Sequence, residues 1–212
     1  MPSTAQVAQL SKFYISGTPG SNISITAISK AVAAVVTAVN TLAVGDVVLF
    51  GAVTGMPEIN GLLGIVTVAS GSSFTVAIDS SGFATAGTTG TATPHTFAKV
   101  GNVQDFTPDG GTATVIDVTN MDSTAKEKRQ GLQDNGNYSL TFDSDDTDAG
   151  QLRLLAARAA QAVVVFKQTY PGGLKIRAWQ GFVQKVTEPA AGVDKVLRSS
   201  ATIVVTGPIF RG

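Results

Sequence analysis

The sequence predicts a mainly β (α+β) protein with one flanking helix. Short runs in which apolar and polar residues alternate recur along the chain, and turn-forming residues separate them. One segment, from about residue 148 to residue 160, is predicted to form an amphipathic helix. A single helix beside many strands is typical of mainly β or α+β domains.

Composition divides the 212-residue chain near Pro94. Residues 16–93 are rich in Gly, Ser, Thr, Ala and Val and carry four charged side chains, whereas most of the remaining charge and the only Trp follow from His95. A chain of this length can form one large domain or two small ones. The shift in composition predicts two units with different surfaces.

Short, regularly spaced strands are expected in the first unit, at 46–50, 65–68 and 74–78. Such spacing indicates a small barrel or sandwich. Residues 31–39 are ambiguous, because Val32, Val35, Val36 and Val39 also fit a helical stripe. Four valines in nine residues favour a strand there.

The second unit alternates more clearly. One face of each predicted strand is apolar: Tyr138, Leu140 and Phe142 in 137–143; Leu197, Ala201, Ile203 and Val205 in 196–205; and Ile176, Ala178 and Phe182 opposite Lys175, Arg177 and Trp179. This period of two predicts sheets with one buried face and one solvated face. Gly-rich turns are expected at 109–111, 134–136 and 171–173.

A helix is expected from about Asp148 to Ala160. Thr147 or Asp146 can cap its N-terminus, where the helix dipole favours acidic residues. Its predicted buried stripe consists of Leu152, Leu155, Ala156 and Ala159.

Charge and cysteine content narrow the class of function. Fifteen basic and fifteen acidic residues give zero net charge, which does not favour gripping nucleic acid by its phosphates. A charged fraction of only 14% together with zero net charge favours association. The chain lacks cysteine, so disulfides, thiolate catalysis and thiolate metal sites are excluded.

Neither a secretory signal nor a membrane span is predicted. The densest apolar stretch, 31–39, is about half the ~20 residues that a membrane helix needs. We therefore expect synthesis in a cytoplasm, and no membrane partner.

No catalytic, metal or cofactor site is predicted. The acidic run 143–148 fails the EF-hand template, because Asp148 and Leu154 stand where Gly and Glu are required. His95 is the only histidine, and its place between the two units suggests a surface linker residue. Phosphate-binding glycine motifs are also missing. A pair of carboxylates could still meet in space, which leaves a small carboxylate hydrolase as a remote alternative.

The segment 122–131 forms part of an unusually long connection. About eighteen residues separate the predicted strands 113–118 and 137–143, whereas hairpin loops usually have two to five. It is either a mobile surface loop or an arm that orders against a neighbouring molecule.

Several of these pieces occur in a recognisable order. They are Phe97-Ala-Lys-Val-Gly, Ile116-Asp-Val-Thr, Asp122-Ser-Thr-Ala, Gly131-Leu-Gln-Asp, Tyr138-Ser-Leu-Thr-Phe, the acidic loop and helix, Ala162-Val-Val-Val-Phe-Lys, Pro171-Gly-Gly, Trp179-Gln-Gly-Phe-Val, and Thr202 to Ile209. The order resembles the major tail tube proteins of long-tailed (siphophage-type) bacteriophages. The resemblance covers His95 to Ile209, with Lys12 to Ser16 as the first strand.

A second resemblance concerns the first unit. Residues 45–61 (GDVVLFGAVTGMPEING) are similar to a small β-barrel related to the first catalytic-cysteine half-domain of ubiquitin-activating enzymes. Without cysteine, the segment carries no ubiquitin chemistry. The two resemblances imply a tube domain formed by 1–17 and 95–212, interrupted by an inserted barrel at 18–94.

The tail tube resemblance implies a structural function without enzymatic activity. It implies hexameric rings that stack into the DNA-conducting tube of the virion tail, made in the bacterial host cytoplasm. The implied partners are other copies of the chain and the tail terminator, tape measure and tail-tip proteins, while DNA passes without specific binding. The residues expected to form the assembly arm are Asp122, Ser123, Thr124, Ala125, Lys126, Glu127, Lys128, Arg129, Gly131 and Leu132. The main alternative is a tail-tip or fibre-type binding module that contacts the host surface.

Overall fold

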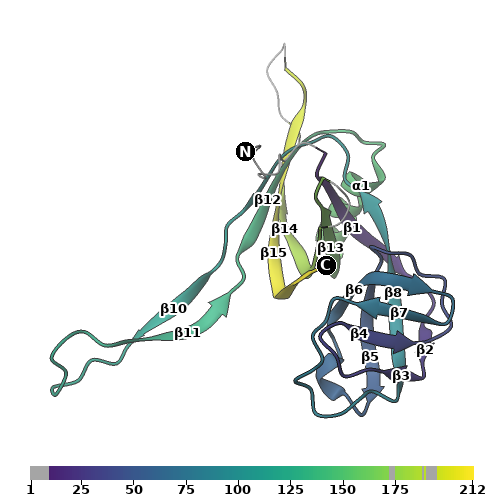
Figure 1. Cartoon of the computed structure of the whole chain (residues 1–212). Coiled ribbons are helices and arrows are strands. Elements are labelled where there is room, and N and C mark those ends of the chain that lie inside the picture. The colour runs from purple at the N-terminus through teal and green to yellow at the C-terminus, as the bar shows by residue number, and fades with distance from the viewer. Residues whose placement is uncertain (1–9, 172–174, 188, 190–194) are drawn as a thin grey trace, which may run out of the picture.

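The computed structural model describes residues 10–171, 175–187, 189 and 195–212, and within them the fold is mainly β, as the sequence predicts (Figure 1). One α-helix, α1 (Ala149–Ala159), and one 3-10 turn, η1 (Pro57–Ile59), accompany the strands of this range. The strands are β1 (Lys12–Pro19), β2 (Ile23–Ile25), β3 (Ala27–Ile28), β4 (Ala34–Thr37), β5 (Val47–Thr54), β6 (Leu63–Ser70), β7 (Ser73–Val76), β8 (Thr89–Lys99), β9 (Val103–Pro108), β10 (Thr112–Asp117), β11 (Lys128–Asp134), β12 (Asn137–Asp143), β13 (Val163–Thr169), β14 (Ile176–Val186) and β15 (Arg198–Arg211).

Thirteen strands form one antiparallel sheet. Its order is β3-β4-β7-β6-β5-β8-β1-β13-β14-β15-β12-β9, and β2 pairs with β8 beside this path. The path is open within the described residues, with β3 and β9 as its two end strands. The two remaining strands, β10 and β11, pair only with each other there.

The main β unit, which we define as the described residues within 11–19, 95–108 and 137–212, has an aromatic core. Trp179 is fully buried, and its ring stacks on Tyr138 with the centroids 4.4 Å apart. Phe13, Phe106 and Phe166 surround the same indole. Aromatic pairs at such separations stabilise a core beyond the area that they bury.

The small β unit, defined as residues 20–94, has a core of its own built from Val, Ile and Ala with Phe50 and Phe74. A third cluster joins the two units. In it Val47, Leu63 and Ile65 pack with Val165, Ile176 and Ala178 of the main β unit.

Strand β8 is continuous across the predicted boundary at 94/95. Its first half pairs with β5 and β2, and its second half pairs with β1, where Pro19 lies opposite His95. The division into 1–17, 18–94 and 95–212 stays a prediction, since the clusters describe packing and not independent folding; residues 1–9 also lie outside the described part. His95 lies inside a strand and is partly buried, so the prediction of a linker residue is wrong.

The helix lies where the sequence predicts it, but the prediction of its buried face is wrong. Gly150, Gln151, Leu154 and Ala157 are buried, whereas Leu152 and Leu155 are almost half exposed. Gly150 fixes this rotation, because a Cβ there would lie 2.3 Å from the carbonyl oxygen of Lys99. The N-cap is Asp148, which accepts a hydrogen bond from the Gln151 amide at 2.8 Å, and neither Thr147 nor Asp146 takes that position.

Most predicted strand faces are confirmed. The apolar face of β12 is buried, β7 overlaps the strand expected at 74–78, and the segment 31–39 contains a strand, although only over β4. The prediction that Trp179 lies on a solvated face of β14 is wrong, because both faces of that strand are covered there. Trp179 packs into the aromatic core, and Ile176 and Ala178 pack into the third cluster. Phe182 and Leu197, which we expected inside, are exposed.

Candidate assembly surfaces

Strands β10 and β11 form a two-stranded arm that projects from the body of the molecule (Figure 1). Thr112 lies opposite Asp134 at its base, and Asp117 lies opposite Lys128 near its tip. The register shifts between Ala113 and Val115, which marks a bulge. We call residues 109–136 the assembly arm.

Two Gly-rich turns hold the base of the assembly arm. The predicted turns at 109–111 and 134–136 face each other, and Gly111 and Gly136 both have positive φ (67° and 75°). A Cβ at Gly111 would run into the carbonyl oxygen of Asp134. The Asp109 amide donates to the Asn137 carbonyl at 2.8 Å, and the Asn135 side chain donates to the Gly207 carbonyl at 2.7 Å. The arm is therefore anchored to both β12 and β15.

The tip of the assembly arm is closed by short side-chain hydrogen bonds. The Thr119 amide and hydroxyl both donate to the Asp117 carboxylate, which lowers the pKa of Asp117 below its ordinary value. Asn120 accepts from the Asp122 amide, and Thr119 accepts from the Glu127 amide. These contacts fold residues 118–127 into a defined turn.

The structure places the predicted arm residues in two settings. Asp122, Ser123, Thr124, Ala125, Lys126 and Glu127 lie in the turn, whereas Lys128, Arg129, Gly131 and Leu132 lie in β11. The prediction of a long connection without strands between 118 and 137 is wrong, because β11 lies within it. KRQGLQD shows no apolar alternation, because neither face of β11 contacts the protein core, so the pattern that reveals other strands is missing here.

Apolar side chains on the assembly arm are exposed. Val115 and Ile116 are more than half exposed, Leu132 is 91% exposed and Met121 is fully exposed. A two-stranded hairpin without a third strand or a packed face is only marginally stable in water. Exposed apolar groups on a projecting hairpin are typical of contact surfaces, and the role of the arm in assembly stays a prediction.

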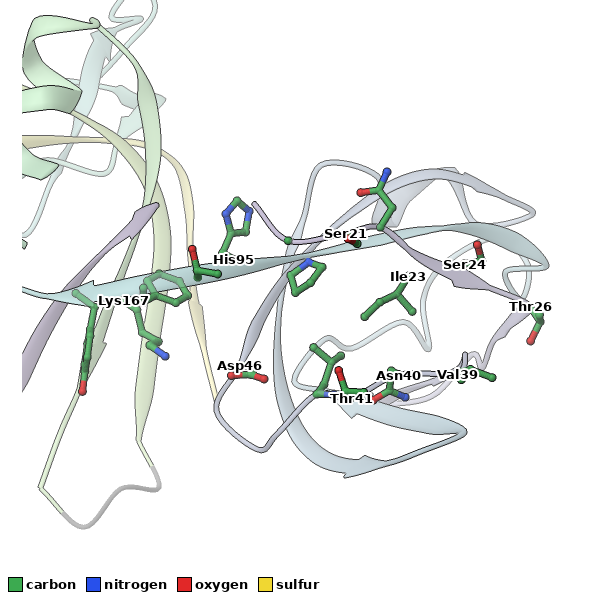
Figure 2. Close-up of a pocket in the computed structure, with 17 residues that line it drawn as sticks. Ser21, Ile23, Ser24, Thr26, Val39, Asn40, Thr41, Asp46, His95 and Lys167 are labelled. Atoms are coloured by element: carbon green, nitrogen blue, oxygen red, sulfur yellow. Dashed lines mark hydrogen bonds between the residues drawn. The ribbon is translucent and has the colours of Figure 1, made fainter. Parts of the chain in front are cut away.

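A second surface is the open groove between the two units (Figure 2). Lys167 of β13 reaches across it, and its Nζ donates to the Gly45 carbonyl at 3.4 Å. The same ammonium lies 4.4 Å from the ring centroid of Phe97, and burial lowers its pKa although Asp46 opposes that shift. Lys167 thus links the small β unit to the main one, a role that the sequence pattern did not reveal.

His95 lines the same groove without a hydrogen-bond partner among the described residues for either ring nitrogen. Burial lowers its pKa, because the imidazolium form would lose hydration. Its surroundings favour the neutral ring.

A third surface lies at the base of the assembly arm. Arg177 of β14 and Arg211 of β15 are direct cross-strand partners there. The groove they line also contains the side chains of Gln133, Asn135 and Asn137. We call this the arginine groove.

The acidic run 143–148 caps the helix and forms local side-chain contacts. Asp143 forms an ion pair with Arg198 (3.0 Å), Asp145 accepts from the Thr147 amide and hydroxyl, and Asp148 is the N-cap. Across the described ranges, no group of three or more His, Cys, Asp or Glu side chains is placed to hold a metal ion.

No helix in the same ranges is long and apolar enough to cross a membrane.

A family model described as phage tail tube protein, TTP, matches residues 54–211. The chain belongs to the phage tail tube protein family. The match begins inside β5 and includes the assembly arm, α1 and all strands from β6 onward. A search of curated proteins gives no match.

Family membership makes this chain a structural component of the virion tail that self-assembles into a tube. It indicates a structural role. The likeness of residues 45–61 to a ubiquitin-activating half-domain stays a prediction.

Proposed function

We propose that this tail tube protein forms hexameric rings that stack into the DNA-conducting tube of the tail, with the assembly arm bridging copies. The projecting arm with its exposed apolar side chains is the observation that supports this most directly. Rings of identical subunits need heterologous contacts, in which one surface meets a different surface of the next copy. An arm that reaches away from its own body supplies such a contact.

The end strand β9 provides a second contact in this proposal. Its outer edge has no partner strand within the described residues, and unpaired edges are templates for pairing with another chain. Lys and Arg are balanced by Asp and Glu, so the tube wall as a whole has no excess charge with which to retain DNA.

In the same proposal the predicted insertion at 18–94, which contains the small β unit, projects outward from the tube. It contacts the main β unit through β8, Lys167 and the third cluster, which is compatible with a unit carried on one side. The terminator, tape measure and tail-tip proteins are the partners expected at the ends and in the lumen of the tube.

Size-exclusion chromatography with light scattering, run at rising protein concentration, tests the ring. The proposal expects a species of six times the 21.6 kDa chain mass, followed by larger polymers. Discrete trimers would favour a tail-tip module, and a monomer at every concentration would refute the proposal.

A further inference from the structure

The arginine groove contains an unusual pair of charges. Arg177 and Arg211 lie directly opposite each other on neighbouring antiparallel strands. Like charges in this position are destabilising unless an anion lies nearby. The guanidinium of Arg177 lies 5.0 Å from the ring centroid of Tyr170, which holds one of the two cations in place.

Neither guanidinium of this pair forms an ion pair with a described residue. The one ion pair found among the described residues joins Arg198 and Asp143, at the other end of the β12–β15 ladder. The groove is otherwise lined by glycines, apolar residues and Tyr138, together with Gln133, Asn135 and Asn137, whose side-chain amides can donate hydrogen bonds. Arginine forks with neighbouring amide donors are suited to a carboxylate.

A carboxylate without a recorded partner, that of Asp146, lies near the opposite end of the same ladder among the described residues. Asn137 pairs with Val204 at the end near the groove, and Asp143 pairs with Arg198 at the far end, about 20 Å away at 3.4 Å per residue. Just beyond Asp143, Asp146 is exposed and its carboxylate has no hydrogen bond or ion pair among the described residues. Asp145 beside it is held ionised by its hydrogen bonds from Thr147.

We propose that the arginine groove of one copy receives the acidic loop, Asp145 and Asp146, of a second copy in the adjacent ring. This rests on the proposed function, and it specifies how stacking is directed. A cationic end that meets an acidic end gives a head-to-tail contact that repeats without closing, whereas joining two equal ends would bring like charges together. The balanced charge of the chain is consistent with two opposite charges that neutralise each other on assembly.

A charge swap tests this inference. Arg211→Glu and Asp146→Arg, made separately, should each raise the protein concentration needed for half-maximal tube formation by about tenfold or more, and leave rings intact. The double variant should recover tubes, because the reversed charges again meet. Arg211→Lys, which keeps the charge, should assemble close to the unaltered protein. Arg211 is chosen because it is exposed, whereas Arg177 is partly buried with its guanidinium over the Tyr170 ring.

Thermal unfolding and Trp179 fluorescence establish that each variant is folded, since that side chain is buried in the core. Single variants that form tubes like the unaltered protein would overturn the inference, as would folded single variants whose combination fails to recover tubes. If Arg211→Glu changes only the retention of double-stranded DNA in tubes, the groove binds phosphate and the inference is wrong. Failure of the unaltered protein to form rings would instead contradict the proposed function.

Discussion

Replacement of Leu132 by Ser tests the role of the assembly arm. This side chain is 91% exposed on β11, so its removal takes no packing away from the isolated subunit. Burial of a leucine side chain against a neighbouring copy contributes about 2 kcal/mol. Its loss should therefore raise the critical concentration for assembly by roughly 30-fold, at 1.4 kcal/mol per factor of ten.

Sedimentation across a concentration series measures that change. Val32→Ser is the matched control, because Val32 is 74% exposed on the small β unit and is expected to face away from the tube. The control should assemble at the concentration of the unaltered protein. Equal critical concentrations for Leu132→Ser and Val32→Ser, with both variants folded, would refute the assignment of the arm as a contact surface.

Three further predictions concern the body of the subunit. Gly150→Val should push α1 away from β8 and lower the melting temperature by several degrees in a thermal scan, because any Cβ there collides with the Lys99 carbonyl. Gly71→Val is the control: this position is open to solvent, so the melting temperature should change little. His95 has a lowered pKa in the folded state, so the unfolded state binds more protons as the pH falls through about 6.5, and the free energy of unfolding should decrease there. His95→Gln should reduce that decrease in denaturant titrations at pH 5 and 7.5. An unchanged pH dependence would contradict the assignment. Replacing residues 20–94 by Asn-Gly, a two-residue hairpin turn between the paired Pro19 and His95, should leave tubes of unchanged bore in electron micrographs; a lost or widened tube would show that the small β unit is part of the wall.

Alternation was the most reliable signal in this sequence. It predicted β12 with its buried Tyr138, Leu140 and Phe142, and most of the buried face of β15. These strands have one face on the core, so the side-chain period of two is visible in the chain itself.

Where both faces or neither face of an element is covered, the pattern failed. Trp179 lies in a strand that is buried on both sides, and β11 lies in an arm that is exposed on both sides. The prediction of the buried helix face was wrong for a third reason. The close approach of Gly150 to a neighbouring strand decides which residues of α1 are buried, and that approach is a tertiary contact.

The candidate surfaces depend still more on tertiary structure. The expected arm residues do lie on a projecting segment, but Val115 and Ile116 of the partner strand were not anticipated as part of it. Arg177 and Arg211 are 34 positions apart, and only the pairing of β14 with β15 brings them together. Lys167 likewise acquires its contact with Gly45 through the packing of two distant segments.

A cryo-electron microscopy reconstruction of the assembled protein tests the central claim most directly. The account predicts stacked rings with six-fold symmetry in which the β10–β11 ribbon of each subunit lies against another copy. Assemblies without six-fold rings, or rings in which that ribbon extends into solvent, would contradict it.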